Sequence, residues 1–243
     1  MDKKTARALS DLTTNFYEQV HDSFDATRQR PWQGWDEVMQ VACRCGLPAH
    51  GRLRVLDLAC GNLRFERYLL GLGYEVEAYA YDNCDELVGA QDGAGLDLAF
   101  HHVDLAGALF DEALDRALNA PPCDMAVCFG FMHHVPVASL RGEALQALVD
   151  AVRPGGMVAV SFWQFARSAR LMAKAQPVEG GDAGDYLLGW QNRDDVWRYC
   201  HSFTEAEIDE LVRQCGVEAT EVARFSADGK TKDLNRYLIL RRN

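Results

Sequence analysis

The chain has 243 residues, 48% of them hydrophobic and 25% charged, which is the composition of a globular protein long enough to bury a sizeable core. No apolar run is long enough to span a bilayer and the first residues lack an apolar signal core, so we expect no membrane segment. The net charge of -11 argues partly against a nucleic-acid partner, because such proteins usually carry a basic face.

The first fifty residues carry two amphipathic segments, which predict helices over 2–20 and 35–46. From residue 53 onward, apolar runs alternate with amphipathic segments. The apolar runs predict strands at 53–58, 74–81, 98–103, 123–129 and 156–163. The segments between them predict helices at about 63–71, 84–90, 107–119 and 139–152. This alternation is typical of a doubly wound parallel sheet.

The connection over about 164–203 shows no clear periodicity and is rich in Trp, Tyr, Arg and Gly. A connection of this length inside a compact domain is usually functional or mobile. We therefore expect it to form part of a lid over a ligand.

The last forty residues contain a helix signal and two further apolar runs. Thr204 with Glu207 three residues later indicates a capping box that opens a helix over 204–215. Strands are predicted at 217–225 and 233–241, with a turn at Ala227-Asp228-Gly229-Lys230 between them. The sequence thus predicts a single α/β domain over 1–243, composed of a helical cap (1–50), a core (51–163), a lid or substrate region (164–203) and a C-terminal helix with two strands (204–243).

The stretch Val55-Leu-Asp-Leu-Ala-Cys-Gly-Asn-Leu-Arg-Phe65 is the most informative part of the chain. A strand, a tight turn with Gly61 and a helix start form the arrangement that holds nucleotide-like ligands in α/β proteins. The three-glycine spacing and the Gly-Lys-Ser/Thr ending of phosphate-binding loops are absent. Asp57, on the strand itself, points instead to a ligand with a cationic end, although an acid here can also cap the next helix.

Further acids follow the second and third predicted strands. Asp82 can accept hydrogen bonds from both hydroxyls of a ribose. Asp104 would lie beside an adenine amine, and capping of the following helix explains it almost as well. At the end of the fourth strand, Phe129-Gly130 would pass under the ligand.

Two groups of side chains raise the question of a metal. His133 and His134 at the cleft mouth could be a metal pair, an acid–base unit or packing residues, and we favour packing and ligand contact. The eight cysteines include no CxxC pair, and Cys43 and Cys45 on one helix are more often inert than metal-binding. We predict no bound metal and a reduced, cytoplasmic setting.

With the Pro-Gly-Gly turn and strand of Val152–Trp163, these motifs occur in the order found in class I S-adenosylmethionine-dependent methyltransferases, which the chain resembles over about 55–163. The resemblance implies a Rossmann-like fold, in which a C-terminal antiparallel β-pair extends a parallel five-stranded sheet. It also implies S-adenosyl-L-methionine as cofactor and S-adenosyl-L-homocysteine as product. Ala59 and Leu63 stand where glycines are common in that family, and the methyl of Ala59 is expected to weaken binding or shift the cofactor. The implied cofactor contacts are Tyr17, Arg28, Trp32, Asp57, Ala59, Cys60, Gly61, Asn62, Asp82, Asn83, Asp104, Leu105, Phe129, Gly130 and His134.

The flanks resemble a narrower family, the tRNA wobble-uridine carboxymethyl methyltransferases. The matching segments are Phe16-Tyr17, Thr27-Arg28, Pro31-Trp32, Gly184–Trp190, Arg198–Phe203 and Asn235–Leu240. The resemblance implies methyl transfer to the carboxylate of 5-carboxymethyluridine, and such a group is ionised at neutral pH and needs no general base. It also implies tRNA as a partner and a small activator protein as a second one. The implied substrate-positioning residues are His133, Trp163, Trp190, Arg198 and His201.

Other interpretations of these flanks stay open. Arg28 pairs either with the acceptor carboxylate or, as we prefer, with the carboxylate of the cofactor. Trp32 and Trp190 can be ordinary packing residues, and Arg198 can be a solvated surface arginine. A small-molecule carboxyl O-methyltransferase and a non-catalytic methyltransferase-like partner subunit are the alternative functions.

Overall fold

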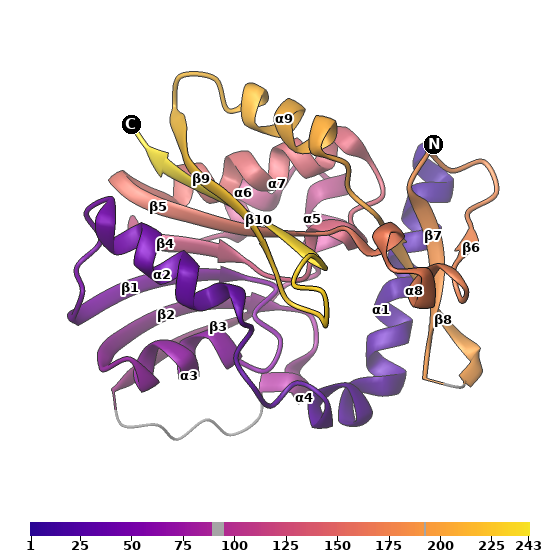
Figure 1. The fold of residues 1–243 in the computed structure, drawn as a ribbon, viewed down its shortest axis with the longest axis horizontal. Helices are drawn as coiled ribbons and strands as arrows, with labels where there is room; N and C mark the ends of the chain where they lie inside the picture. Colours follow the sequence, from indigo (N-terminus) through magenta and orange to yellow (C-terminus); the bar gives the residue numbers. More distant parts are fainter. Residues whose placement is uncertain (89–94, 192) are drawn as a thin grey trace.

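The computed structural model describes residues 1–88, 95–191 and 193–243, and a seven-stranded sheet forms its centre (Figure 1). The strand order is β3-β2-β1-β4-β5-β10-β9. The first five are parallel, β10 is antiparallel to β5, and β9 is antiparallel to β10, as predicted. The bounds are β1 Gly51–Leu58, β2 Tyr74–Asp82, β3 Leu96–His102, β4 Cys123–Cys128, β5 Val152–Trp163, β9 Ala219–Ala227 and β10 Asn235–Arg242.

Successive side chains of the central strands enter opposite cores, because a strand alternates its side chains between the two faces of the sheet. On β1, Val55 belongs to one core and Leu56 to the other. Helices α2 (Gly34–Arg44) and α3 (Arg64–Gly71) cover the face of Val55. The face of Leu56 is covered by α5 (Leu105–Phe110), α6 (Leu114–Ala117), α7 (Ala138–Ala151) and α9 (Glu205–Gln214).

Three predicted helices differ in extent from the observed ones. The helix expected over 2–20 continues six residues further, since α1 spans Lys3–Ala26. The single helix expected over 107–119 is wrong, since α5 and α6 are separate short helices. Between them Glu112 has a φ of +52°, in the left-handed region, and an α-helix cannot continue through such a residue. The helix expected over 84–90 is present as α4 (Asp85–Val88), and its last two positions lie outside the described residues.

The connection between β5 and α9 contains strands that the sequence analysis does not predict. It forms the 3-10 turn η2 (Phe165–Arg167), the short helix α8 (Ala169–Met172) and an antiparallel sheet of β6 (Gln176–Pro177), β7 (Asp185–Trp190) and β8 (Arg193–His201). This small sheet lies beside the long helix α1 (Lys3–Ala26) at one end of the molecule (Figure 1).

Helix α1 attaches the small sheet to the rest of the protein. Phe16 and Val20 pack against Trp190 and Val196. The backbone N–H of Tyr199 donates to Thr13 Oγ1 at 3.1 Å. The small sheet therefore packs mainly on α1, and Leu188 and Cys200 of this sheet also form a cluster with Trp163 at the end of β5.

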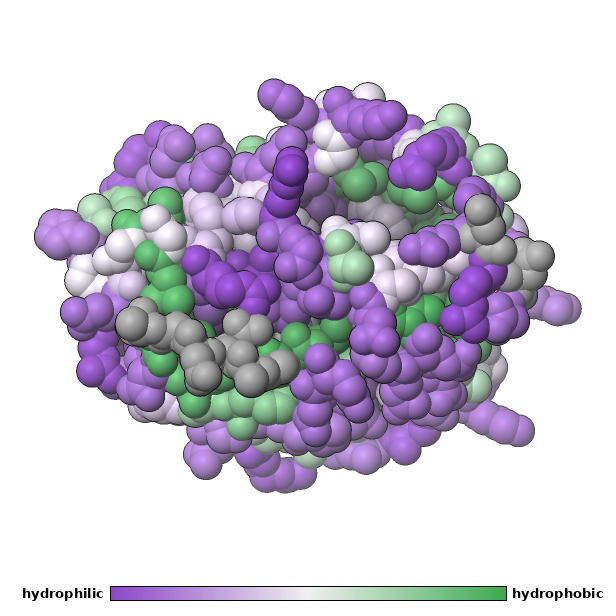
Figure 2. All heavy atoms as spheres, turned by 90° about the horizontal axis from the view of Figure 1, so that it is seen from below, coloured by the Kyte–Doolittle hydropathy of each residue, from purple (hydrophilic) through white to green (hydrophobic). Residues whose placement is uncertain are grey.

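The surface is largely polar. Figure 2 shows one face, which is mainly hydrophilic with apolar side chains in smaller areas between polar ones. Leu72 and Val217 are the exposed large hydrophobic residues in the described part of the chain. None of the helices that the structure describes combines the length and apolar character needed to cross a bilayer.

Candidate active site

A cavity of about 1070 Å³, partly open to solvent, lies at the carboxyl ends of β1, β2 and β4. Strand order reverses between β1 and β4, and ligands of open α/β sheets bind at such a reversal. Every residue that we predicted to contact the cofactor lines this cavity: Tyr17, Arg28, Trp32, Asp57, Ala59, Cys60, Gly61, Asn62, Asp82, Asn83, Asp104, Leu105, Phe129, Gly130 and His134. The structure thus brings them together, and their roles in binding stay predictions.

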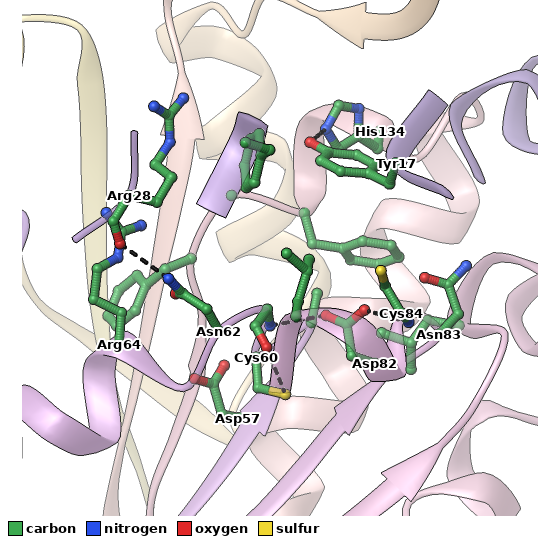
Figure 3. Close-up of a pocket in the computed structure, with 18 of the residues that line it drawn as sticks. Tyr17, Arg28, Asp57, Cys60, Asn62, Arg64, Asp82, Asn83, Cys84 and His134 are labelled. Atoms are coloured by element: carbon green, nitrogen blue, oxygen red, sulfur yellow. Dashed lines mark hydrogen bonds between the residues drawn. The ribbon is translucent and has the colours of Figure 1, made fainter. Parts of the chain in front are cut away.

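The turn after β1 forms the floor of the cavity (Figure 3). Ala59, Gly61 and Leu63 all have positive φ, at +64°, +53° and +53°. A Cβ built on Gly61 would meet no atom within 4 Å, so the backbone there borders open space. The backbone N–H groups of Ala59 and Cys60 donate to Tyr81 O at 2.8 and 3.2 Å and hold the turn against β2. Alanine and leucine thus adopt a conformation that favours glycine, which preserves the shape of the turn at a cost in strain.

Asp82 connects this turn to the segment after β2. Its Oδ2 accepts from Gly61 N at 2.8 Å and its Oδ1 accepts from Cys84 N at 3.0 Å. Burial raises the pKa of Asp82, while backbone N–H groups act in the opposite direction. Each carboxylate oxygen keeps acceptor capacity for a second donor, as ribose hydroxyls would require.

Asp104 also accepts a backbone hydrogen bond, since its Oδ1 receives Gly107 N at 3.0 Å and thereby caps α5. The alternative role for Asp104 as a helix cap is therefore real. The residue is exposed and still borders the cavity, so capping leaves Oδ2 available to a ligand.

Two arginines lie at one end of the cavity (Figure 3). The guanidinium of Arg28 lies 4.8 Å from the ring centroid of Phe24, and that of Arg64 lies 5.4 Å from each of the rings of Trp32 and Trp35. Burial lowers the pKa of both, that of Arg64 to about 10. Neither forms a salt bridge within the described residues, so this end of the cavity suits an anionic group.

Tyr17 and His134 close the opposite side with a hydrogen-bonded pair. Nδ1 of His134 lies 2.7 Å from Tyr199 O, which can only accept, so Nδ1 carries the hydrogen. Nε2 then accepts from the Tyr17 hydroxyl at 2.9 Å. Burial, together with the charge of Arg198, lowers the pKa of His134 to about 3, and burial raises that of Tyr17 to about 12. Neither group exchanges a proton near neutral pH, which argues against an acid–base role, and the predicted contact of both residues with the cofactor stays a prediction.

His133, His134 and Cys200 lie close enough together to suggest a metal site. Both ring nitrogens of His134 already have partners, however, and the cationic Arg198 lies close by. We therefore assign no metal to this group.

The five predicted substrate residues are not among the residues that line the cavity. Trp163 packs on the ring of His133 at 4.9 Å, and Trp190 donates from Nε1 to Ser23 Oγ at 2.9 Å. Arg198 is only 7% exposed, which excludes the interpretation as a solvated surface arginine. Its guanidinium lies over Phe16 at 4.5 Å and Nη1 has no hydrogen-bond partner.

His201 requires a correction. Its Nδ1 lies 2.6 Å from Asp185 Oδ1, its Nε2 lies 2.7 Å from Glu207 Oε1, and the side chain is 1% exposed. With both nitrogens engaged by carboxylates, His201 joins β7, β8 and α9 and cannot position a substrate.

Several lining residues are absent from our predictions. Ser10, Thr13 and Thr14 precede Tyr17 with the spacing i, i+3, i+4 and i+7, which places all four on one face of α1. Because Tyr17 was predicted to contact the cofactor, that spacing could have identified the other three residues as well. Phe24, seven residues after Tyr17, continues the same face of α1. Residues supplied from other segments had no comparable signal: Trp35, Arg64, Phe65, Cys84, Leu87, Ala106 and Phe131.

Comparisons with known proteins identify the family of the chain. A family model described as a methyltransferase domain matches residues 6–222. The tRNA (carboxymethyluridine(34)-5-O)-methyltransferase ALKBH8 of Macaca fascicularis is 26% identical over 162 residues, which cover 67% of this chain and 21% of that protein. The chain thus spans about a fifth of the length of that relative.

Solved structures show the same fold at low sequence identity. A 1,6-didemethyltoxoflavin-N1-methyltransferase of Burkholderia thailandensis, with bound S-adenosylhomocysteine, is 18% identical with a TM-score of 0.63, covering 100% of this chain and 92% of that one. An S-adenosylmethionine-dependent methyltransferase of Clostridium acetobutylicum is 12% identical with a TM-score of 0.61, covering 93% and 99%. The predicted Rossmann-like class I fold is confirmed, and the chain belongs to the methyltransferase domain family.

Proposed function

We propose that this chain is an S-adenosylmethionine-dependent methyltransferase that esterifies a carboxylate, with a carboxymethyl-modified wobble uridine of tRNA as acceptor. The observation that carries the proposal is the buried side chain of Arg198, whose Nη1 has no hydrogen-bond partner among the residues that the structure describes. A buried guanidinium with an unpartnered nitrogen is costly, and an acceptor carboxylate would complete its hydrogen bonds. The relative ALKBH8 is a tRNA (carboxymethyluridine(34)-5-O)-methyltransferase, which supports this choice of acceptor.

The residues of the cavity fit the cofactor. Asp57, whose Oδ1 is buried without a partner, would take the ammonium group, and Arg28 with Arg64 would take the carboxylate. Asp82 would accept from the ribose hydroxyls and Asp104 from the adenine amine. When bound, the cofactor would supply an electrophilic methyl group to the acceptor carboxylate, and its sulfur would keep the electron pair of the carbon–sulfur bond.

Catalysis by these residues would consist of alignment and exclusion of water. The acceptor carboxylate is already ionised near neutral pH, so no side chain has to remove a proton. The neutral Tyr17–His134 pair would border the bound cofactor on the side nearest Arg198 and would help to exclude water from the two reactants. Holding the two reactants in line accounts for the rate enhancement that such a site requires.

The arrangement of arginines supports a polyanionic partner in spite of the net charge of -11. Arg28, Arg30, Arg64 and Arg67 gather where α1 ends and α3 begins. Arg64 Nη1 donates to Arg30 O at 3.1 Å, which holds the two segments together. Arginines beside the cavity are suited to phosphates of an RNA backbone.

The acceptor is tested by supplying labelled cofactor with separate pools of tRNA and small metabolites. We expect label in the methyl ester of a carboxymethyl uridine after nuclease digestion and mass spectrometry. Label confined to small acids overturns the tRNA proposal and supports the small-molecule alternative. Binding of S-adenosylhomocysteine without transfer to either pool supports the non-catalytic subunit. Activity that appears only with host extract supports the activator protein implied by the resemblance.

The role of Arg198 is tested by Arg198→Met, which keeps an unbranched apolar chain in place of the aliphatic part and removes the charged guanidinium. We expect kcat/KM to fall about 30-fold or more, as when one partner of a buried charge pair is removed. The affinity for S-adenosylhomocysteine should stay unchanged, because Arg198 does not line the cofactor cavity. Arg193→Met on the same strand, where the arginine is exposed and paired with Asp195, is the control. A parallel loss of cofactor binding in Arg198→Met contradicts the role.

A further inference from the structure

Two carboxyl groups lie together beneath the cavity. Asp57 at the end of β1 is 3% exposed and Glu66 on α3 is 0% exposed. Each side chain is within hydrogen-bonding reach of the other. Asp57 Oδ1 and both carboxylate oxygens of Glu66 are otherwise buried without a hydrogen-bond partner. Two ionised carboxylates have no hydrogen to share, so this contact is a hydrogen bond only when one of them is protonated.

The charged groups around the pair do not neutralise it. Arg64 and Arg67 on α3 are the nearby cations, and neither forms a salt bridge with Asp57 or Glu66 within the part of the chain that the structure describes. The guanidinium of Arg64 is stacked on Trp32 and Trp35 instead.

The remaining titratable neighbours add no positive charge. From β2, the buried Asp82 adds a further carboxylate. Cys60 in the turn and Cys128 at the end of β4 also face Asp57, and burial raises the pKa of both thiols, so they are neutral. Burial raises the pKa of Asp57 well above its usual range and the neighbouring Glu66 raises it further. Burial also raises the pKa of Glu66.

We propose that Asp57 and Glu66 share one proton in the free protein and release it to solvent when the ammonium group of the cofactor binds at Asp57. Asp57 lines the cavity and would touch the cofactor, whereas Glu66 does not line it and acts through Asp57, as a positioning residue. An ammonium group supplies the positive charge that the site lacks, and the pair can then hold two negative charges. This inference rests on the cofactor of the proposed function and does not depend on the acceptor.

The proposal predicts the direction of the pH dependence of binding. The free pair holds its proton at pH values where ordinary carboxyl groups are ionised, and the cofactor binds preferentially to the form without it. The affinity should therefore rise with pH by up to about tenfold per pH unit and level off above the apparent pKa of the pair.

The proton is counted by titration calorimetry with S-adenosylhomocysteine in buffers of different ionisation enthalpy. At about pH 6 the amine of the ligand is protonated and takes up no further proton. We expect a release that approaches one proton. 5′-Methylthioadenosine, which keeps the adenine and ribose and lacks the amino-acid part, should release none. A release with this second ligand would assign the proton to Asp82 and overturn the proposal.

A variant identifies the source of the proton. Glu66→Gln can donate a hydrogen bond to Asp57 and cannot ionise, so it should bind S-adenosylhomocysteine with no proton release and with a flat pH dependence. Glu75→Gln, at the exposed opposite end of β2, should behave like the wild type. An unchanged release in Glu66→Gln overturns the proposal.

The two-ligand comparison on the wild type does not depend on the folding of any variant. S-adenosylhomocysteine binding without proton release in the wild type overturns the shared proton and leaves the cofactor assignment intact. Failure of S-adenosylhomocysteine to bind at all overturns the cofactor assignment itself.

Discussion

Single residues of the turn after β1 carry strain that a glycine would not. Ala59 and Leu63 have φ values of +64° and +53°, and the left-handed region costs a residue with a Cβ about 1–2 kcal/mol. The hydrogen bonds from the turn to Tyr81 O hold Ala59 in this conformation. The two positions differ in what their side chains do, because Leu63 is fully buried whereas Ala59 is partly exposed at the edge of the cavity.

We expect Ala59→Gly to increase the free energy of unfolding by roughly 0.5–1 kcal/mol, as the relief of strain exceeds the entropic cost of glycine. Urea denaturation measures this change. Leu63→Gly relieves the same strain but removes a buried leucine side chain, and should destabilise the protein by about 2 kcal/mol or more. Equal effects of the two substitutions would contradict this explanation.

Site residues were predicted correctly where a short stretch of sequence around them carries the signal. Asp57, Gly61 and Asp82 were placed from the order of short motifs along the chain. Arg64 reaches the cavity by stacking on two tryptophans of another segment, and no local pattern shows that. His201 was assigned wrongly because its partner Asp185 lies on the neighbouring strand of a sheet that was not predicted.

At the scale of elements, a buried polar network attaches the small sheet to the core. Asp185 of β7 contacts His201 of β8, and His201 also contacts Glu207 of α9. Arg141 of α7 lies 3.8 Å from each of the two carboxylates. Burial acts to raise the pKa of Glu207, but hydrogen bonds from His201 and Thr204 outweigh it and lower the pKa to about 2.

This network predicts a specific loss of stability in acid. The pKa of Glu207 is lower in the folded chain than the value of about 4.3 expected in the unfolded chain. Its contribution to the free energy of unfolding is therefore fully present above about pH 4.3 and is lost as the pH falls toward 2. We expect Glu207→Gln to cost about 1–2 kcal/mol near neutral pH, after allowance for its partial exposure, and to differ progressively less from the wild type below about pH 4. Denaturation at several pH values tests this. Glu210→Gln on the same helix should show a small difference that does not vary in this way.

The predictability of elements depended on which contacts determine them. The central strands are continuous apolar runs, because both faces of the sheet are buried, and they were found from the sequence. The small sheet was missed because it packs on α1 through a few side chains, such as Trp190 and Val196. The break between α5 and α6 at Glu112 was missed because nothing in the local sequence marks a positive φ there.

For the molecule as a whole, the distribution of charge matters more than its sum. The chain carries a net charge of -11, yet four arginines gather beside the cavity. A phosphate backbone is attracted mainly by the charges nearest to it, because screening in physiological salt limits the range of electrostatic interactions to about 8 Å. The overall acidity therefore does not oppose the proposed RNA contact at this end.

We expect the double substitution Arg30→Glu with Arg67→Glu to weaken tRNA binding and to reduce the slope of log affinity against log salt by about two or more. The affinity for S-adenosylhomocysteine should not change, since neither residue lines the cavity. Filter binding over a range of salt concentrations measures the slope. Arg213→Glu with Arg241→Glu, at exposed positions on α9 and β10, makes the same change in net charge and should leave the slope as it is. Equal losses in both double variants would attribute the effect to net charge alone.

Helix α1 contributes to two surfaces at once, with Ser10, Thr14 and Tyr17 toward the cavity and Phe16 and Val20 toward the small sheet. In protein engineering, this makes the helix and the insertion one transferable module. A chimera that receives only residues 164–203 from another methyltransferase would set a foreign sheet on Phe16 and Val20 and displace Tyr17 from His134. Exchange of the insertion between relatives therefore requires residues 1–33 and 164–203 to move together, while the central sheet can stay in place.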